Sequence, residues 1–239
     1  MTTMQIAIVN PNSTRAMTDV IAVAARRVAG PDVAILPLTN LDGPPSIQGV
    51  IDGAAAVPGV LSLVAATRAD AFIIACFDDT GLDAARCVAD APVVGIGEAA
   101  CHAASLVAHR FSIVTTLSRS VPVLRNNLEL HGLSRKCASV LATEIPVLQL
   151  ENASEETLAR IEATVEKAIV TDGAEAIVLG CAGMADLAAR LERRFGVPVI
   201  DGIASAVGLA VALVRMGVTT SRQGLYASAS AAAPERMAV

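Results

Sequence analysis

Two of the five cysteines occupy matching positions in two similar segments. Residues 71–76 read AFIIAC and residues 176–181 read AIVLGC, so each cysteine closes an apolar run typical of a buried strand. Asp78, Asp79 and Thr80, which suit the start of a helix, follow the first cysteine. A thiol is suited to acid–base chemistry because its ordinary pKa, about 8.5, lies close to neutrality. Cys76 and Cys181 are therefore the candidates for such chemistry.

The chemistry that this pair offers is the movement of one proton across a carbon centre. If the two segments face each other across a cleft, one thiolate removes a proton from one face of a substrate carbon. The other thiol then returns a proton to the opposite face. A helix N-terminus close to each cysteine is expected to favour the thiolate through its partial positive charge. The sequence thus predicts racemisation without a metal, flavin or pyridoxal cofactor, provided that donors stabilise the substrate anion.

The remaining cysteines and the histidines show no pattern of their own. Cys87, Cys101 and Cys137 lie inside predicted helices or beside a strand start, where a lone cysteine usually packs as a small hydrophobe. Five cysteines without a C-x-x-C pair indicate reduced thiols in the cytoplasm rather than disulfides or a zinc site. The histidines lack the spacing of metal ligands, so no metal is expected; they are His102, His109 and His131.

Composition excludes several partner classes. The chain has 239 residues, of which 54% are hydrophobic, enough for a large buried core. A net charge of −5 argues against a surface for nucleic acid or an anionic membrane. We expect no secretory signal before the first strand, and the apolar run at 202–214 is too short to cross a bilayer. The expected partner is a small-molecule substrate in the cytoplasm.

Short apolar runs alternate with segments of helical character, which indicates an α/β fold with parallel sheets covered on both faces. The expected strands are residues 5–10, 33–37, 71–76, 93–95, 111–115, 139–144, 176–180 and 197–200. The expected helices include residues 16–28, 82–89, 98–107, 155–171 and 186–195. The Ala/Ser-rich stretch Ser228–Pro234 is interpreted as a poorly ordered tail.

The cysteine segments belong to a longer internal repeat. The offset of 105 residues between Cys76 and Cys181 brings three further landmarks into register, and a fourth follows one residue later. The matches are Ile8-Val9 with Ile113-Val114, Ser13 with Ser118, Leu82 with Leu187, and Pro92-Val93-Val94 with Pro198-Val199-Ile200. An ancestral duplication explains this register better than chance similarity among apolar strands does. It predicts two four-stranded lobes related by a pseudo-twofold axis: residues 1–97 with 205–239 returning to them, and residues 98–204.

Polar loops follow the first strand of each lobe, at residues 10–14 and 115–118. Ligands bind at this end of parallel sheets, so the loops are expected to present donors to a carbonyl or amide. Ser13 and Ser118 are also expected to cap the helices that follow. Residues 43–49, GPPSIQG, form either a mobile edge of the cleft or an ordinary surface loop. Glu98, which opens a helix, either caps that helix or contacts the cleft, and the capping role is favoured.

These motifs together resemble the hydantoin racemases of the aspartate/glutamate racemase superfamily, over nearly the whole chain up to about residue 220. The matching segments are IVNPNST (8–14), GPPSIQG (43–49), ACFDDTGLDAAR (75–86), GIGEAA (95–100), VTTLSRSVP (114–122), VLGCAGMADL (178–187) and GVPVIDGIASAV (196–207).

The resemblance implies two flavodoxin-like lobes with the active site between them, and a homo-oligomer. It also implies cofactor-independent racemisation at C5 of 5-monosubstituted hydantoins, or of the related ureide allantoin. Cys76 and Cys181 would act as the two bases. The residues expected to contact the substrate are Asn10, Ile47, Phe77, Asp78, Asp79, Thr115, Thr116, Ala182, Gly183 and Met184.

Three rival functions are weaker. Amino-acid racemases for aspartate or glutamate typically place Asn and Thr after the cysteine, whereas here the segments read Cys76-Phe77-Asp78 and Cys181-Ala182-Gly183. Arylmalonate decarboxylases use one cysteine, in the second lobe, so the presence of Cys76 disfavours them. A two-lobe protein that binds a small molecule without turnover is disfavoured by the paired thiols.

Overall fold

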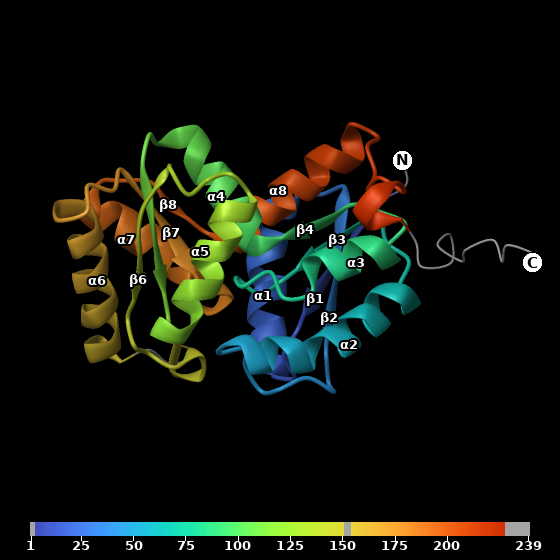
Figure 1. Cartoon of the computed structure of the whole chain (residues 1–239), viewed down its shortest axis with the longest axis horizontal. Coiled ribbons are helices and arrows are strands. Elements are labelled where there is room, and N and C mark those ends of the chain that lie inside the picture. The colour runs from blue at the N-terminus through green and yellow to red at the C-terminus, as the bar shows by residue number, and fades with distance from the viewer. Residues whose placement is uncertain (1–2, 151–153, 228–239) are drawn as a thin grey trace, which may run out of the picture.

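The computed structural model describes residues 3–150 and 154–227, which form two four-stranded sheets, each with all its strands parallel. The two sheets lie side by side as two lobes (Figure 1). The first sheet has the order β2-β1-β3-β4, with β1 (Met4–Asn10), β2 (Val33–Thr39), β3 (Ala71–Ile74) and β4 (Val93–Gly95). The second has the order β6-β5-β7-β8, with β5 (Phe111–Thr115), β6 (Cys137–Ala142), β7 (Ala176–Gly180) and β8 (Val199–Ile200).

The identical strand order of the two sheets is what the internal repeat predicts, and the predicted two-lobe α/β fold is confirmed. The strands expected at 93–95, 111–115 and 176–180 have the observed bounds. The strand expected at 71–76 ends earlier, at Ile74. The Ala75 N–H still bonds to the Val9 carbonyl at 2.8 Å, but the chain then turns, and the Cys76 carbonyl accepts from the Asp79 N–H at 2.9 Å. Cys76 therefore lies on a loop.

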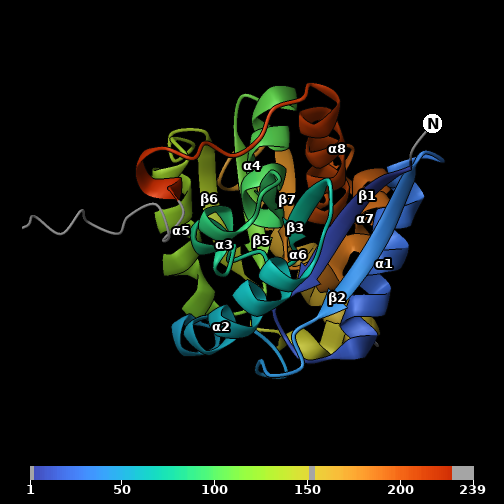
Figure 2. The same cartoon turned by 90° about the vertical axis from the view of Figure 1, so that its right-hand side faces the viewer.

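The helices cover both faces of each sheet (Figures 1 and 2). They are α1 (Arg15–Ala29), α2 (Val50–Ala66), α3 (Leu82–Val88), α4 (Ile96–Val107), α5 (Val121–Leu130), α6 (Glu155–Val170), α7 (Ala188–Phe195) and α8 (Gly202–Arg215). Three of them, α2, α5 and α8, were not among the named candidates. Helix α2 contains Pro58 and α8 is almost wholly apolar, so neither has the alternation of faces that marks a surface helix. The helix expected at 186–195 is split into the 3₁₀ helix η3 (Ala182–Leu187) and α7.

The sequence of β1 is apolar without a break because its alternate side chains pack into cores on opposite faces of the sheet. Ile6 and Ile8 belong to the core cluster beneath α1 and α8, whereas Ala7 and Val9 belong to the cluster beneath α2 and α3. Side chains on a strand point alternately to opposite faces, so a strand covered on both sides must be apolar throughout.

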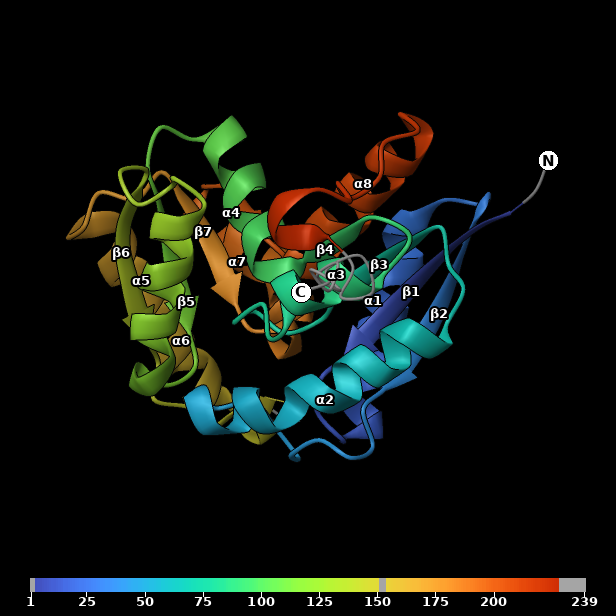
Figure 3. The same cartoon turned by 45° about the vertical axis from the view of Figure 1, so that its right-hand side comes forward.

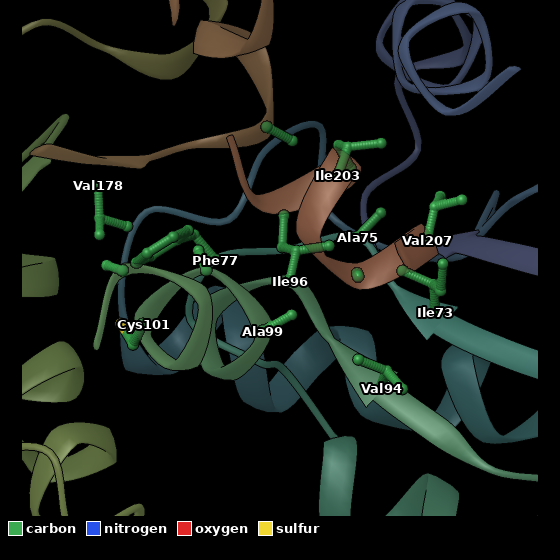
Figure 4. Packing of buried hydrophobic residues seen from close by; sticks show 14 of the residues in the cluster. Ile73, Ala75, Phe77, Val94, Ile96, Ala99, Cys101, Val178, Ile203 and Val207 are labelled. Atoms are coloured by element: carbon green, nitrogen blue, oxygen red, sulfur yellow. The ribbon is translucent and has the colours of Figure 1, made fainter. Parts of the chain in front are cut away.

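The core on the α1 side continues from the first lobe into the second. The same buried cluster contains Ile73 of β3, Phe77 of the following loop, Val178 of β7 and Ile203 of α8. Figure 4 shows Phe77 close to Val178, so a residue of the loop that carries Cys76 packs against the second sheet. Helix α8 contacts α1, α4, β3 and β4. The exact lobe boundaries at residues 97 and 204 stay a prediction.

The chain after α8 returns across the first lobe. The Tyr226 hydroxyl, in the 3₁₀ helix η4 (Gly224–Tyr226), donates to Asp83 Oδ1 at 2.9 Å. The predicted tail Ser228–Pro234 lies outside the described residues. Within the described ranges, no helix combines the length and the apolar character needed to cross a bilayer.

Candidate active site

Cys76 and Cys181 line one cavity between the lobes. Its walls come from the segments that follow β1 and β3 in the first lobe and β5 and β7 in the second. In the first sheet the chain passes from β1 to β2 on one side and from β3 to β4 on the other, and β5 and β7 do the same in the second sheet. Such a reversal opens a crevice at the carboxyl ends of the two central strands. The lining residues are Asn12, Met17, Ile21, Ile47, Ala75, Cys76, Phe77, Asp78, Thr115, Thr116, Ser120, Val147, Gly180, Cys181 and Ala182.

The structure brings most of the predicted site residues to this cavity. In addition to the two cysteines, the lining includes Ile47, Phe77, Asp78, Thr115, Thr116 and Ala182. Four predicted contacts lie outside the lining, namely Asn10, Asp79, Gly183 and Met184. Met184 is completely buried in the core of the second lobe, and Gly183 lines an adjoining cavity.

Asn10 lies behind the cavity wall and positions its neighbour Asn12. The buried Asn10 amide donates to Asn12 Oδ1 and to Thr18 Oγ1, both at 3.0 Å. Asn12 Oδ1 also accepts from the Thr14 N–H at 3.0 Å. The predicted capping of the next helix by Ser13 is therefore wrong, because Thr14 holds the N-cap position of α1 and Asn12 satisfies its N–H. The predicted capping by Ser118 is wrong as well, since Ser118 is itself the first residue of the 3₁₀ helix η1 (Ser118–Ser120).

Asp79 caps a helix from a distance. Its carboxylate accepts from the Gly97 N–H at 2.9 Å and from the Glu98 N–H at 2.8 Å, at the start of α4. Burial, followed by the nearby Glu98 charge, raises the pKa of Asp79. Glu98 itself accepts from the Gly95 N–H at 3.2 Å, which confirms its predicted capping role. Asp79 thereby ties the loop that carries Cys76 to α4.

Replacing Asp79 with alanine is expected to lower the free energy of unfolding by about 2 kcal/mol, because two buried N–H groups lose their acceptor. Urea denaturation followed by circular dichroism measures this change. Asp19→Ala, an exposed substitution on α1, is the matched control and should stay within about 0.5 kcal/mol of wild type. Equal stabilities for the two variants would contradict the capping role.

The thiol of Cys76 is half-buried and receives a hydrogen bond from a residue of its own loop. The Thr80 hydroxyl donates to Cys76 Sγ at 3.4 Å. Burial raises the pKa of Cys76 well above its ordinary value, and the Asp78 and Cys181 charges raise it further, whereas the Thr80 hydrogen bond lowers it. The two thiols are close enough that ionisation of one opposes ionisation of the other.

Cys181 has a related environment with one difference. It directly follows β7, and the Gly183 N–H donates to it, which lowers its pKa. Burial outweighs this donor and raises the pKa of Cys181 to about 11. The backbone N–H groups that follow each cysteine therefore favour the thiolate, that of Asp78 at Cys76 and that of Gly183 at Cys181, but burial outweighs them at both positions. Helix α3 begins only at Leu82, too far along the chain to act on Cys76, and desolvation decides the pKa of both thiols.

Asp78 is the one carboxyl group in the described lining, and the second lobe holds it in place. Ser120 Oγ donates to Asp78 Oδ2 at 3.4 Å, and the Asn127 amide donates to the Asp78 carbonyl at 3.1 Å. Burial raises the pKa of Asp78 to about 6. A carboxyl group that titrates near neutrality thus lies beside two thiols.

The loop at 43–49 forms an edge of the cavity through Ile47, which favours the first of its two sequence-based interpretations. Next to it, Arg119 of the second lobe donates to Gln48 Oε1 at 3.0 Å. Figures 1 and 3 show the N-terminal end of α2, which follows this loop, extending toward the second lobe. The loop therefore bridges the two lobes at the cavity mouth.

The sequence reasoning missed several residues of the site. Asn12 and Ser120 lie inside quoted motifs, but nothing in the sequence distinguished them from their neighbours. Thr80 was considered only as a capping residue. Met17, Ile21 and Val147 carried no signal, because apolar side chains that face a cavity have the same sequence pattern as those that face the core. In the described part of the chain, no three His, Cys, Asp or Glu side chains gather as a metal-ligand cluster.

Known proteins resemble the chain over almost its full length. The Asp/Glu/Hydantoin racemase family pattern matches residues 6–210. A hydantoin racemase from Rhizobium meliloti is 44% identical, over 94% of this chain and 94% of the relative. Among solved structures, an allantoin racemase from Klebsiella pneumoniae is 44% identical and superposes with a TM-score of 0.91, covering 99% of this chain and 96% of the other.

More distant structures share the fold alone. A glutamate racemase from Bacillus anthracis superposes with a TM-score of 0.66 at 18% identity, covering 92% of this chain and 85% of the other. The superpositions on these racemases agree with the two-lobe architecture. The chain belongs to the Asp/Glu/Hydantoin racemase family and is an isomerase.

Proposed function

We propose that the protein racemises 5-monosubstituted hydantoins, the class that includes allantoin, by proton transfer at C5 without a cofactor. The observation that carries the proposal is that Cys76 and Cys181, one from each lobe, line the same cavity. The close relatives support the choice of substrate ring, since they are a hydantoin racemase and an allantoin racemase.

The reaction needs one thiolate and one thiol. The thiolate takes the C5 proton and becomes a thiol, while the electron pair of the broken C–H bond delocalises as an enolate onto the neighbouring ring carbonyl. The other thiol gives its proton to the opposite face of C5 and becomes the thiolate. The product is the mirror-image hydantoin, and the two cysteines have exchanged protonation states.

Burial affects this reaction in two opposing ways. A raised thiol pKa leaves little thiolate at neutral pH, but the thiolate that forms is a stronger base. A strong base suits a carbon acid. The Thr116 hydroxyl and the Asn12 amide line the cavity as donors for the developing enolate, whereas the Ser120 hydroxyl donates to Asp78.

The charge of the cavity supports a neutral ring over a free dicarboxylate. The lining residues that the structure describes include one acidic group, Asp78, and no Lys, Arg or His. The two carboxylates of aspartate or glutamate would meet a negative charge there without a compensating cation. A hydantoin ring carries no such charges and can offer its N–H groups to Asp78 and its carbonyls to the hydroxyls.

Polarimetry tests the proposal directly. An optically pure 5-substituted hydantoin is expected to lose its optical rotation when enzyme is added, with EDTA present and no added cofactor. L-Aspartate under the same conditions is expected to keep its rotation. Persistent rotation of hydantoins and allantoin together with racemisation of aspartate would contradict the proposal. A homo-oligomer and a cytoplasmic location remain predictions alongside it.

A further inference from the structure

A second cavity adjoins the one that contains the thiols. It shares four lining residues with the first cavity: Met17, Ile21, Val147 and Ala182. Met17 and Ile21 lie on α1 of the first lobe, whereas Val147 and Ala182 come from the second lobe. The two cavities are therefore neighbours between the lobes. We call the second cavity the side chamber.

The side chamber is apolar. Its other described lining residues are Val20 of α1, Leu150 of the 3₁₀ helix η2 (Val147–Leu150), and Gly183 and Leu187 of η3. Together with the four shared residues, every described lining position is thus an apolar side chain or glycine. Such a surface offers a ligand hydrophobic contact and no side-chain hydrogen bond.

Gly183 marks the boundary between the reactive sulfur and the side chamber. A Cβ atom added at this position would lie 3.7 Å from Cys181 Sγ on one side and 3.4 Å from Leu150 Cδ1 on the other. A single small residue therefore separates the thiol from the chamber wall. A group attached to a carbon that reacts at Cys181 needs only a short extension to reach the chamber.

We propose that the side chamber binds the C5 substituent of the substrate and selects alkyl and aryl substituents over the ureido group of allantoin. This inference rests on the proposed function, in which the cavity that contains the thiols holds the hydantoin ring. We call that cavity the ring cavity, and the side chamber is assigned to the substituent. C5 is the reacting carbon, so its substituent necessarily starts beside the thiols. The side chamber is the adjoining space, and it shares four lining residues with the ring cavity.

The discrimination follows from hydrogen bonding. An isobutyl or benzyl group gives up no hydrogen bond when it enters an apolar chamber, and the burial of its apolar surface is favourable. A ureido group carries N–H donors and a carbonyl that leave water without finding a polar side chain on the described walls. A hydrophobic pocket disfavours an isostere that carries one added hydroxyl by about 100-fold. We therefore expect kcat/KM for an alkyl hydantoin to exceed that for allantoin by about tenfold or more.

The test compares substituents of equal size. Isobutyl and ureido groups have the same number of non-hydrogen atoms, so 5-isobutylhydantoin and allantoin differ in polarity at nearly constant volume. Wild-type enzyme is expected to racemise the isobutyl compound with the higher kcat/KM, after subtraction of the uncatalysed rate. Equal or faster racemisation of allantoin would overturn the inference while leaving the proposed racemase intact. Inactivity on every hydantoin would instead overturn the proposed function, and this inference with it.

A variant pair tests the location of the subsite. Val20 lines the side chamber but not the ring cavity, whereas Val23, on the same helix and 47% exposed, lines neither. Val20→Phe is expected to lower the kcat/KM ratio of 5-isobutylhydantoin to 5-methylhydantoin by about tenfold, because the ring fills the chamber. Val23→Phe should leave the ratio unchanged. An unaltered ratio in Val20→Phe, or an equal fall in both variants, would overturn the assignment.

Discussion

Replacing either Cys76 or Cys181 with serine is expected to lower kcat for racemisation by about a hundredfold to ten thousandfold, the range that one general acid–base group contributes. Serine keeps a similar volume, so the loss should come with little change in stability. Its hydroxyl has a far higher pKa than a thiol and cannot supply the base near neutral pH. Polarimetry with both enantiomers of a 5-substituted hydantoin measures the loss.

Hydrogen exchange separates the two thiols. In each variant the remaining cysteine can still remove the proton that faces it and return a proton from solvent to the same face. In deuterated water, Cys76→Ser is therefore expected to exchange the C5 proton of one enantiomer without inversion, and Cys181→Ser that of the other. Proton NMR of the substrate follows this exchange.

Cys137→Ser is the control for this pair. Cys137 is also half-buried, but it lies on β6, and its thiol hydrogen-bonds to the Ser139 carbonyl at 3.3 Å, outside the cavity lining. The Cys137→Ser variant should racemise the substrate at the wild-type rate. Full activity in Cys76→Ser or Cys181→Ser would remove that cysteine from the mechanism.

Asp78→Asn is expected to shift the pH dependence of the reaction toward lower pH. Burial is the larger cause of the raised pKa of Cys76 and Cys181, but the Asp78 charge contributes at both positions. Removing that charge should lower the pKa of each thiol by about one unit, a typical effect of a nearby like charge. The rising limb of kcat/KM against pH should move by the same amount.

Two readouts distinguish this electrostatic effect from a lost substrate contact. The pH at which kcat/KM rises reports the thiol pKa. The value of kcat/KM on the plateau above that pH reports contacts that Asp78 makes with the substrate. The rate of alkylation by iodoacetamide against pH gives the thiol pKa without any substrate. Asp42→Asn removes an exposed charge of the first lobe and should change neither curve. If kcat/KM rises at the same pH in Asp78→Asn as in wild type, the Asp78 charge does not influence the thiol pKa and the prediction is contradicted.

The same substitution has a predicted effect on stability, and its sign follows from linkage. The pKa of Asp78 is raised to about 6 in the folded protein, above its ordinary value of 3.8. The folded state therefore binds more protons than the unfolded state between about pH 4 and pH 6, and stability falls as pH rises through that window. Asp78→Asn should remove this slope and stabilise the protein at pH 7 by about 1–2 kcal/mol, as measured by urea denaturation.

Much of the architecture is readable from the sequence because its signals are local. Apolar runs of strand length gave three strands with the observed bounds, at 93–95, 111–115 and 176–180. The register of the internal repeat predicted two sheets of equal strand order, and it singled out Cys76 and Cys181 from five cysteines. Helices without a polar face were harder to recognise, as α2 and α8 show.

The details of the site depended on atoms from distant segments. Asn10 and Asn12 are two residues apart and chemically identical, yet the fold turns Asn12 into the cavity and uses Asn10 to hold it. Asp79 was expected at the substrate and instead caps α4. Ser120 and Val147 acquire their places only when the lobes come together.

The sequence by itself determined the two-lobe α/β fold, the duplication and the pair of thiols. Periodicity is a property of neighbouring residues, and a repeat is found by comparing two stretches of the same chain. Only the tertiary structure decided how those thiols ionise. Local reasoning from helix N-termini predicted a lowered pKa, whereas both sulfurs are desolvated by atoms that converge from both lobes. Desolvation depends on everything packed around a group, and that is fixed only when segments far apart in the chain meet.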